Sequence, residues 1–224
     1  MIRFDNVRKV YPQGTREVAA LDGLTMEVGK GEFLAVMGPS GSGKSTFLHL
    51  SGGLDLPTSG SVSIDGSATS ALTDDALTLL RRRRIGFVFQ FFNLIPTLRV
   101  IENVSLPLLL DGKRQGDARP RAEALLDRLG LGHRKEHFPD ELSGGEMQRT
   151  AVARALVIDP AIVLADEPTG NLDSATGRGI LELLKEVAEK EGRTVVMVTH
   201  DPAAAAWGTR TVRLRDGRLD GSGA

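Results

Sequence analysis

The sequence predicts an α/β fold built around a mostly parallel β-sheet. Three continuous apolar runs, each of strand length, occupy 33–37, 161–165 and 195–198. Such runs are typical of strands that are buried on both faces, as the strands of a parallel sheet are. Helical segments are expected between these runs, and an alternation of strands and helices favours a parallel sheet. We therefore expect a layered α/β domain.

The first part of the chain is expected to begin with short strands. Residues 2–7 and 24–28 alternate between apolar and polar side chains, and the stretch 29–32, which contains two glycines, marks a turn. After the buried strand at 33–37, the order of elements is predicted to be a helix at 45–50, a strand at 61–65, a helix at 74–84 and a strand at 85–89.

A middle block, 91–158, is predicted to be mainly helical and to be inserted into the sheet domain. It contains apolar residues at helical spacing over 118–129 and a further helix over 144–157. An amphipathic helix is expected over 175–191. The prediction is one domain spanning 1–224, with a core of about 1–90 and 159–219, a helical subdomain of about 91–158 and a frayed tail at 220–224.

Composition excludes several classes of protein. The 224 residues have a formal net charge of −1, whereas proteins held on nucleic acid by their general field are usually basic. There is no cysteine, so neither a disulfide framework nor a thiolate metal site is possible. No apolar run approaches the roughly 20 residues that a membrane helix needs. Any membrane-spanning part of the system is therefore expected to be another polypeptide.

Residues 38–45 match the phosphate-loop pattern G-x-x-x-x-G-K-[ST] in full, and they follow a strand and open a helix, as the pattern requires. Glycines let backbone N–H groups surround phosphate oxygens, and the helix N-terminus favours negative charge. Lys44 is expected to reach the β- and γ-phosphates, and the Ser45 hydroxyl to bind Mg²⁺. The alternative is a glycine-rich turn without a ligand. The candidate phosphate-binding residues are Gly38, Ser40, Gly41, Ser42, Gly43, Lys44, Ser45 and Thr46.

Two carboxylates, Asp166 and Glu167, end the buried strand at 161–165. Open α/β sheets bind ligands at the carboxyl ends of their strands, so both side chains are expected to face that crevice. Asp166 is the candidate Mg²⁺ residue, acting through water, and Glu167 the candidate general base for an attacking water. The alternative is a helix cap or a solvated pair at the end of a strand.

The segment 142–148, Leu-Ser-Gly-Gly-Glu-Met-Gln, lies between the phosphate loop and the acidic pair. Its bare backbone and the Ser143 hydroxyl suit a second phosphate contact, made across a dimer to the nucleotide of the partner. This constellation resembles the ATP-binding cassette (ABC) ATPases over about 2–219. The resemblance implies ATP and Mg²⁺ as ligands, a cassette fold with an N-terminal antiparallel sheet, a homodimer in the ATP-bound state, and a membrane permease on a separate chain.

The resemblance also assigns roles to single residues. Ser143, Gly144 and Gly145 match the segment that binds the γ-phosphate held by the other subunit. Glutamine is commonest at 146, so Glu146 is a departure that adds a negative charge beside a nucleotide. Four further residues match family positions and could instead be structural: His200 as the switch histidine at the γ-phosphate, Gln90 as the coupling glutamine near Mg²⁺ or the water, Tyr11 as the aromatic stacked on adenine, and Asp173 in the loop that crosses the dimer interface.

Several alternatives remain open within and beyond this family. Residues 87–94 and 166–173 look like the macrolide-exporter and lipoprotein-releasing group, and the division-associated ABC ATPase is a near relative. A soluble ABC ATPase acting on nucleic acid, a small-acceptor kinase and a non-hydrolysing regulatory module are the other possibilities. The arginine run at 81–84 ends a helix, where positive charge suits the helix dipole, so no nucleic-acid contact is expected. The expected location is cytoplasmic, on the inner face of the membrane through the permease.

Overall fold

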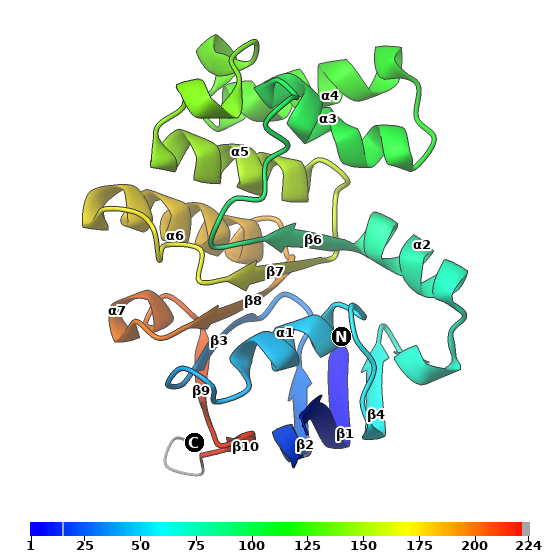
Figure 1. Ribbon diagram of the computed structural model, residues 1–224. Coiled ribbons are helices and arrows are strands. Elements are labelled where there is room, and N and C mark those ends of the chain that lie inside the picture. The colour runs from blue at the N-terminus through cyan, green and yellow to red at the C-terminus, as the bar shows by residue number, and fades with distance from the viewer. Residues whose placement is uncertain (15, 221–224) are drawn as a thin grey trace.

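The computed structural model describes residues 1–14 and 16–220, so all but the first residue of the predicted tail lies outside the described residues. Its centre is a six-stranded sheet (Figure 1). Neighbouring strands run parallel except for the antiparallel pair at one edge. In spatial order the strands are β10 (Arg218–Leu219), β9 (Arg210–Arg215), β3 (Phe33–Met37), β8 (Thr194–Thr199), β7 (Ile162–Asp166) and β6 (Ile85–Val88).

The three apolar runs form β3, β7 and β8, which are adjacent in the middle of this sheet. Nearly every residue in them is buried, because helices or the second sheet cover both faces. The predicted α/β class is therefore confirmed. Strand β9 and the edge strand β10 were not predicted, since their arginines leave no apolar run.

A second, antiparallel sheet has the order β2 (Arg16–Val28), β1 (Ile2–Gln13), β4 (Ser59–Ile64) and β5 (Ser67–Ala68). Strands β1 and β2 are longer than the predicted segments 2–7 and 24–28, because their paired outer halves are mostly exposed and lack a strict alternation. Register shifts interrupt the pairing after Phe4, where Asn6 has a φ of 46°. The antiparallel N-terminal sheet agrees with the expected cassette fold.

Helix α1 (Lys44–Ser51) lies between the two sheets (Figure 1). Its Phe47 ring stacks on Phe4 with the centroids 4.8 Å apart, and both side chains are fully buried. On the other face of the parallel sheet, α6 (Ser174–Glu189) and α7 (Pro202–Ala205) cover β8 and β3. Helix α2 (Asp74–Arg84) occupies the predicted residues and leads into β6. Helix α1 contacts β7 and β8, and its first residues line one cavity with the residues that follow these strands.

The middle block contains α3 (Val100–Leu110), α4 (Gln115–Arg128) and α5 (Gly144–Leu156), which lie together at one end of the molecule (Figure 1). These helices share a hydrophobic core that includes Val104, Leu126 and Ala153. Short 3₁₀ turns at Gly132–Arg134 and Pro139–Glu141 connect α4 to α5. We propose that the domain limits follow this division, with 91–158 as the helical subdomain.

Candidate nucleotide site

A cavity of about 780 Å³ opens where the phosphate loop meets the carboxyl ends of the parallel strands. This volume falls within the range of about 300–1,000 Å³ that small-molecule sites occupy. The side chains around it come from β1 and β2, the start of α1, and the ends of β6, β7 and β8. They are Tyr11, Ala20, Pro39, Ser40, Gly41, Gly43, Lys44, Ser45, Thr46, Gln90, Asp166, Glu167 and His200.

The phosphate loop depends on glycine at position 43. Gly43 caps α1 with a φ of 100°, and a Cβ there would lie 2.3 Å from the carbonyl oxygen of Ala20. Beyond it, Lys44 is almost buried and its ammonium donates to the carbonyls of Gly38 (2.8 Å) and Pro39 (3.0 Å). The Lys44 ammonium therefore binds the loop itself in this structure. It lies at the N-terminus of α1, where the first N–H groups of the helix favour an anion.

Two predicted phosphate-binding residues, Gly38 and Ser42, do not line the cavity. A Cβ on Gly38 would lie 2.3 Å from the Leu214 carbonyl oxygen and 2.4 Å from Ser42 Oγ. The Ser42 hydroxyl is buried and has no hydrogen-bond partner among the described residues. Both residues thus lie behind the loop, where Gly38 allows β9 to approach closely.

The acidic pair, Asp166 and Glu167, lines the cavity at the end of β7. Burial raises the pKa of Asp166, and the neighbouring Glu167 charge raises it further, against the opposing effects of His49, Lys44 and a hydrogen bond from Ser45. A half-buried carboxylate, a serine hydroxyl and the Gln90 side-chain amide around one cavity offer the hard oxygen donors that Mg²⁺ prefers. These residues therefore fit a magnesium ion, which would offset the unfavourable charge of Asp166.

Glu167 and His200 contact each other directly. His200 Nδ1 lies 2.9 Å from Glu167 Oε1, and the His200 N–H donates to Glu167 Oε2 at 3.3 Å. Glu167 has a φ of 44°, and its N–H donates to the Val198 carbonyl of β8 at 3.0 Å. A left-handed non-glycine residue costs about 1–3 kcal/mol and is concentrated at functional sites, so this strained turn is consistent with a catalytic position.

Tyr11 lies at the edge of the cavity, and its hydroxyl donates to Asp55 Oδ2 at 2.7 Å. Burial and this hydrogen bond raise the pKa of the Tyr11 hydroxyl, while Thr46 opposes them. Lys9 Nζ lies 4.9 Å from the ring centroid and covers one face. A base would therefore have to stack on the other face.

Gln90 is joined to the loop that follows the acidic pair. The Asn171 side-chain amide donates to the Gln90 carbonyl oxygen at 2.9 Å. Asp173 caps α6 by accepting from the N–H groups of Ala175 and Thr176, both at 3.0 Å. Asp173 is thus held at a helix start outside the cavity.

The remaining predicted group, Ser143, Gly144 and Gly145, begins α5, and none of the three lines the cavity. A Cβ on Gly144 would lie 3.4 Å from Leu172 Cδ2, so this turn adjoins the 171–173 loop. The buried Gln148 amide donates to the Pro168 carbonyl at 2.8 Å and ties α5 to the turn after Glu167. The predicted site residues therefore form two separate groups on one subunit.

A model of the family described as "ABC transporter" matches residues 21–170. The chain belongs to the ABC transporter family. A lipoprotein-releasing system ATP-binding protein, LolD, of Pseudomonas syringae is 50% identical over 96% of this chain and 94% of its own length. The macrolide export ATP-binding/permease protein MacB of Syntrophobacter fumaroxidans is 47% identical over 98% of this chain but 31% of its own length.

The cassette MJ0796 of Methanocaldococcus jannaschii has the same fold. Its dimeric post-hydrolysis structure, bound to ADP and Pi, superposes with a TM-score of 0.91 at 47% identity, covering 98% of this chain and 97% of that one. The predicted cassette fold and ATPase activity are thereby confirmed, as is the resemblance to the macrolide-exporter and lipoprotein-releasing group. The chain is an ATP-binding and ATP-hydrolysing cassette.

The prediction from sequence missed two residues around the cavity, Ala20 and Pro39. Ala20 has no polar group to mark it, and it reaches the site only because β2 extends beyond the predicted strand. It also missed Arg134, whose Nε donates to Glu146 Oε1 at 2.8 Å. Arg134 lies twelve positions before Glu146 and belongs to no local motif, so no signal in the sequence joins the two residues.

Proposed function

We propose that two copies of this cassette close around two ATP molecules and that this closure moves a separate membrane permease. The observation that carries the proposal is the division of the site into two groups. The cavity holds the phosphate loop, the acidic pair and His200, whereas Ser143–Gly145 begin α5 outside it. When a second copy binds, Ser143–Gly145 of each subunit lie at the cavity of the other subunit. The dimeric state of the similar cassette MJ0796 supports this arrangement.

Hydrolysis then requires mostly positioning and charge neutralisation, as phosphoryl transfer generally does. The free α1 N–H groups bind the phosphate oxygens, and Lys44 exchanges the carbonyls of Gly38 and Pro39 for the β- and γ-phosphates. Glu167 orients and deprotonates the attacking water. His200 is paired with Glu167 in this structure, and it turns to the γ-phosphate when ATP binds. Tyr11 positions the adenine on its open face.

Asp166, Ser45 and Gln90 would hold Mg²⁺, with Asp166 acting through water. The ion supplies neutralisation of the charge on the β- and γ-phosphates. Because Gln90 is also bonded to Asn171, a change at the nucleotide reaches the loop that carries Asp173. Asp173 is the proposed contact across the dimer interface.

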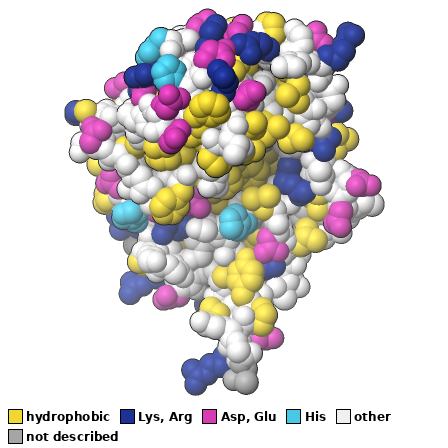
Figure 2. All heavy atoms as spheres, turned by 45° about the horizontal axis from the view of Figure 1, so that its top comes forward, with side chains coloured by type: hydrophobic (Ala, Val, Ile, Leu, Met, Phe, Trp, Pro, Cys, Tyr) yellow, Lys and Arg dark blue, Asp and Glu magenta, His cyan; other side chains and the backbone are white. Residues whose placement is uncertain are grey.

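The permease docks in an apolar groove between the two parts of the cassette. This groove has a volume of about 500 Å³. Figure 2 shows a hollow where hydrophobic side chains adjoin basic ones. Leu54 and Leu110 in the groove are 47% and 61% exposed, and exposed apolar side chains that gather in one groove mark a site of interaction. The groove is lined mainly by Leu54, Phe87, Phe89, Leu106, Pro107, Leu110 and Ile158, with Arg81, Arg82 and Arg154 at its side.

The occupant proposed for this groove is a short apolar helix of the permease, which would be moved when the helical subdomain shifts. No helix in the described residues is long and apolar enough to cross a membrane. We propose that the cassette lies on the cytoplasmic face of the membrane through its contact with the permease. The names of the similar proteins favour export of a compound or release of a lipoprotein as the work performed.

The test is a pull-down of tagged Glu167→Gln protein from detergent-solubilised membranes of its source organism with ATP and Mg²⁺. Co-purified proteins are read by mass spectrometry, and Leu110→Asp, a charge placed in the groove, serves as the matched control. We expect a permease with few spans and a large outer domain, lost with the control. Recovery of only soluble nucleic-acid or ribosomal proteins would refute the coupling to a permease.

A further inference from the structure

Glu146, the departure from the usual glutamine, is not a free charge at the start of α5. Its Oε2 accepts from the Ser143 N–H and from the Ser143 hydroxyl, both at 2.8 Å. Its Oε1 accepts from Arg134 Nε at 2.8 Å, and only 13% of the Glu146 side chain is exposed. The Ser143 oxygen in turn accepts from the Glu146 N–H at 3.3 Å. The hydroxyl that the proposed dimer needs is therefore already engaged.

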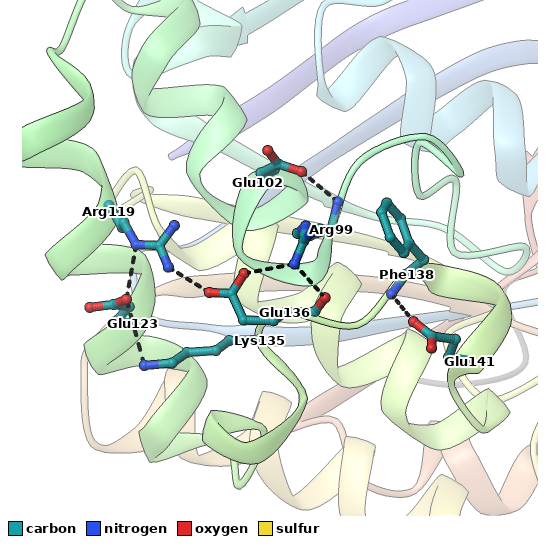
Figure 3. Close-up of polar contacts among 8 residues, drawn as sticks. All are labelled: Arg99, Glu102, Arg119, Glu123, Lys135, Glu136, Phe138 and Glu141. Atoms are coloured by element: carbon teal, nitrogen blue, oxygen red, sulfur yellow. Dashed lines mark hydrogen bonds and ion pairs between the residues drawn. The ribbon is translucent and has the colours of Figure 1, made fainter.

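Arg134 is followed by the segment 135–137, which hydrogen bonds and ion pairs hold against α3 and α4 of the helical subdomain. The ion pairs are drawn in Figure 3, where Glu136 accepts from Arg119 (2.6 Å) and from Arg99 (3.2 Å). The first turn of α3 adds two bonds, in which the N–H groups of Val100 and Ile101 donate to the carbonyls of His137 and Lys135. Exposed ion pairs add little stability each. Together with the backbone bonds, they hold Arg134 in one place.

We propose that Glu146 holds the Ser143 hydroxyl back from the ATP of the partner subunit, and that Arg134 weakens this restraint by neutralising the carboxylate. This inference rests on the proposed contact of Ser143 in the closed dimer. It makes Arg134 and Glu146 positioning residues that set how much ATP is needed for closure.

The physical reason is that a serine hydroxyl has one proton to donate. When Ser143 donates to a phosphate oxygen, its own oxygen faces Glu146 Oε2 without a proton between them. A hydrogen bond to an ionised acceptor is about twice as strong as a neutral one, so a carboxylate resists this exchange more than an amide. The carboxylate also repels the incoming phosphate, and the Arg134 guanidinium offsets that charge.

The same contacts keep the carboxylate ionised. The backbone and hydroxyl of Ser143, with Arg134, lower the pKa of Glu146 to about 2, against the effect of burial. The restraint is therefore present at every physiological pH.

The experiment measures the ATP concentration that gives half-maximal dimer in the Glu167→Gln protein, by analytical ultracentrifugation with Mg²⁺. Glu146→Gln should lower it by about threefold to tenfold, the change expected when a charged hydrogen bond becomes a neutral one. Arg134→Met should raise it, and Glu146→Gln should rescue Arg134→Met to the parent value or below. Arg218→Met removes a distant pair with Asp22, in which the closest atoms are 2.6 Å apart, and should change nothing.

The outcomes separate this inference from the proposed function. A Glu167→Gln protein that stays monomeric at saturating ATP would overturn both. Dimerisation of that protein with an unchanged or raised ATP requirement in Glu146→Gln would overturn the restraint alone. Failure of Glu146→Gln to rescue Arg134→Met would show that Arg134 only supports folding of the loop. Melting curves without nucleotide verify that each variant is folded.

Discussion

Substitution of Gly145 tests how closely the start of α5 packs against α6. A Cβ at this position would lie 2.4 Å from Thr176 Cγ2 on α6, whereas the next atoms of Thr176 are 3.6 Å and 3.7 Å away. Thr176 cannot turn aside easily, because its β-branched side chain is stiff and its backbone N–H is held by Asp173. Overpacking of this kind costs about 1–3 kcal/mol. A helical Gly→Ala change alone gains up to about 1 kcal/mol, so Gly145→Ala should lose a net ~1–2 kcal/mol.

The assay is thermal unfolding without nucleotide. For a protein of this size, ~1–2 kcal/mol corresponds to a fall of about 2–8 °C in melting temperature. Adding Thr176→Ser removes the methyl group but keeps the hydroxyl, so the double variant should regain most of the loss. Among the described residues, nothing outside its own stretch of α6 lies within 4 Å of a new Cβ at Gly179, so Gly179→Ala should melt at or above the parent temperature. If Gly145→Ala and Gly179→Ala behave alike, the packing argument is wrong.

Three further predictions concern the cavity and the loop beside it. Asp166→Asn should abolish Mg²⁺-dependent hydrolysis yet raise the melting temperature at pH 7, because the raised pKa of Asp166 means that its ionised form costs stability. That gain should vanish as the pH falls below the ordinary pKa of an aspartate, and a variant less stable at pH 7 would contradict it. Gly43→Ala should weaken ATP binding at least about tenfold in a nucleotide titration, since it forces a left-handed residue against the Ala20 carbonyl. Arg154→Met removes the donors to the carbonyls of Phe92 and Asn93, so proteolysis within 91–99 should accelerate, and an unchanged cleavage rate would refute this role.

The main architecture could be predicted because it depends on local patterns. The apolar runs that became β3, β7 and β8 need burial on both faces, and α2 is bounded by a Thr73 cap and four arginines that suit a helix end. The phosphate loop carries its own geometry in its glycines. The candidate residues Lys44, Asp166, Glu167, Gln90 and His200 line one cavity because parallel strands end at the same edge.

Other features could not be read from the sequence because they depend on partners far along the chain. Strand β9 is exposed on most residues and exists through its pairing with β3. Gly38 and Ser42 were predicted to line the cavity but do not, because β9 lies against that side of the phosphate loop. The pair of Arg134 with Glu146 arises from how the 3₁₀ turn meets α5.

The central claim is that the Ser143 segment of one subunit meets the phosphate loop of another when ATP is bound. The chain has no cysteine, so it offers a clean background for cross-linking. One copy with Ser40→Cys is mixed with another carrying Ser143→Cys, both in Glu167→Gln, and a short thiol cross-linker is added. We expect a linked species of twice the 24.0 kDa chain only when both copies and ATP are present. Equal cross-linking without ATP, or none with it, would contradict the account.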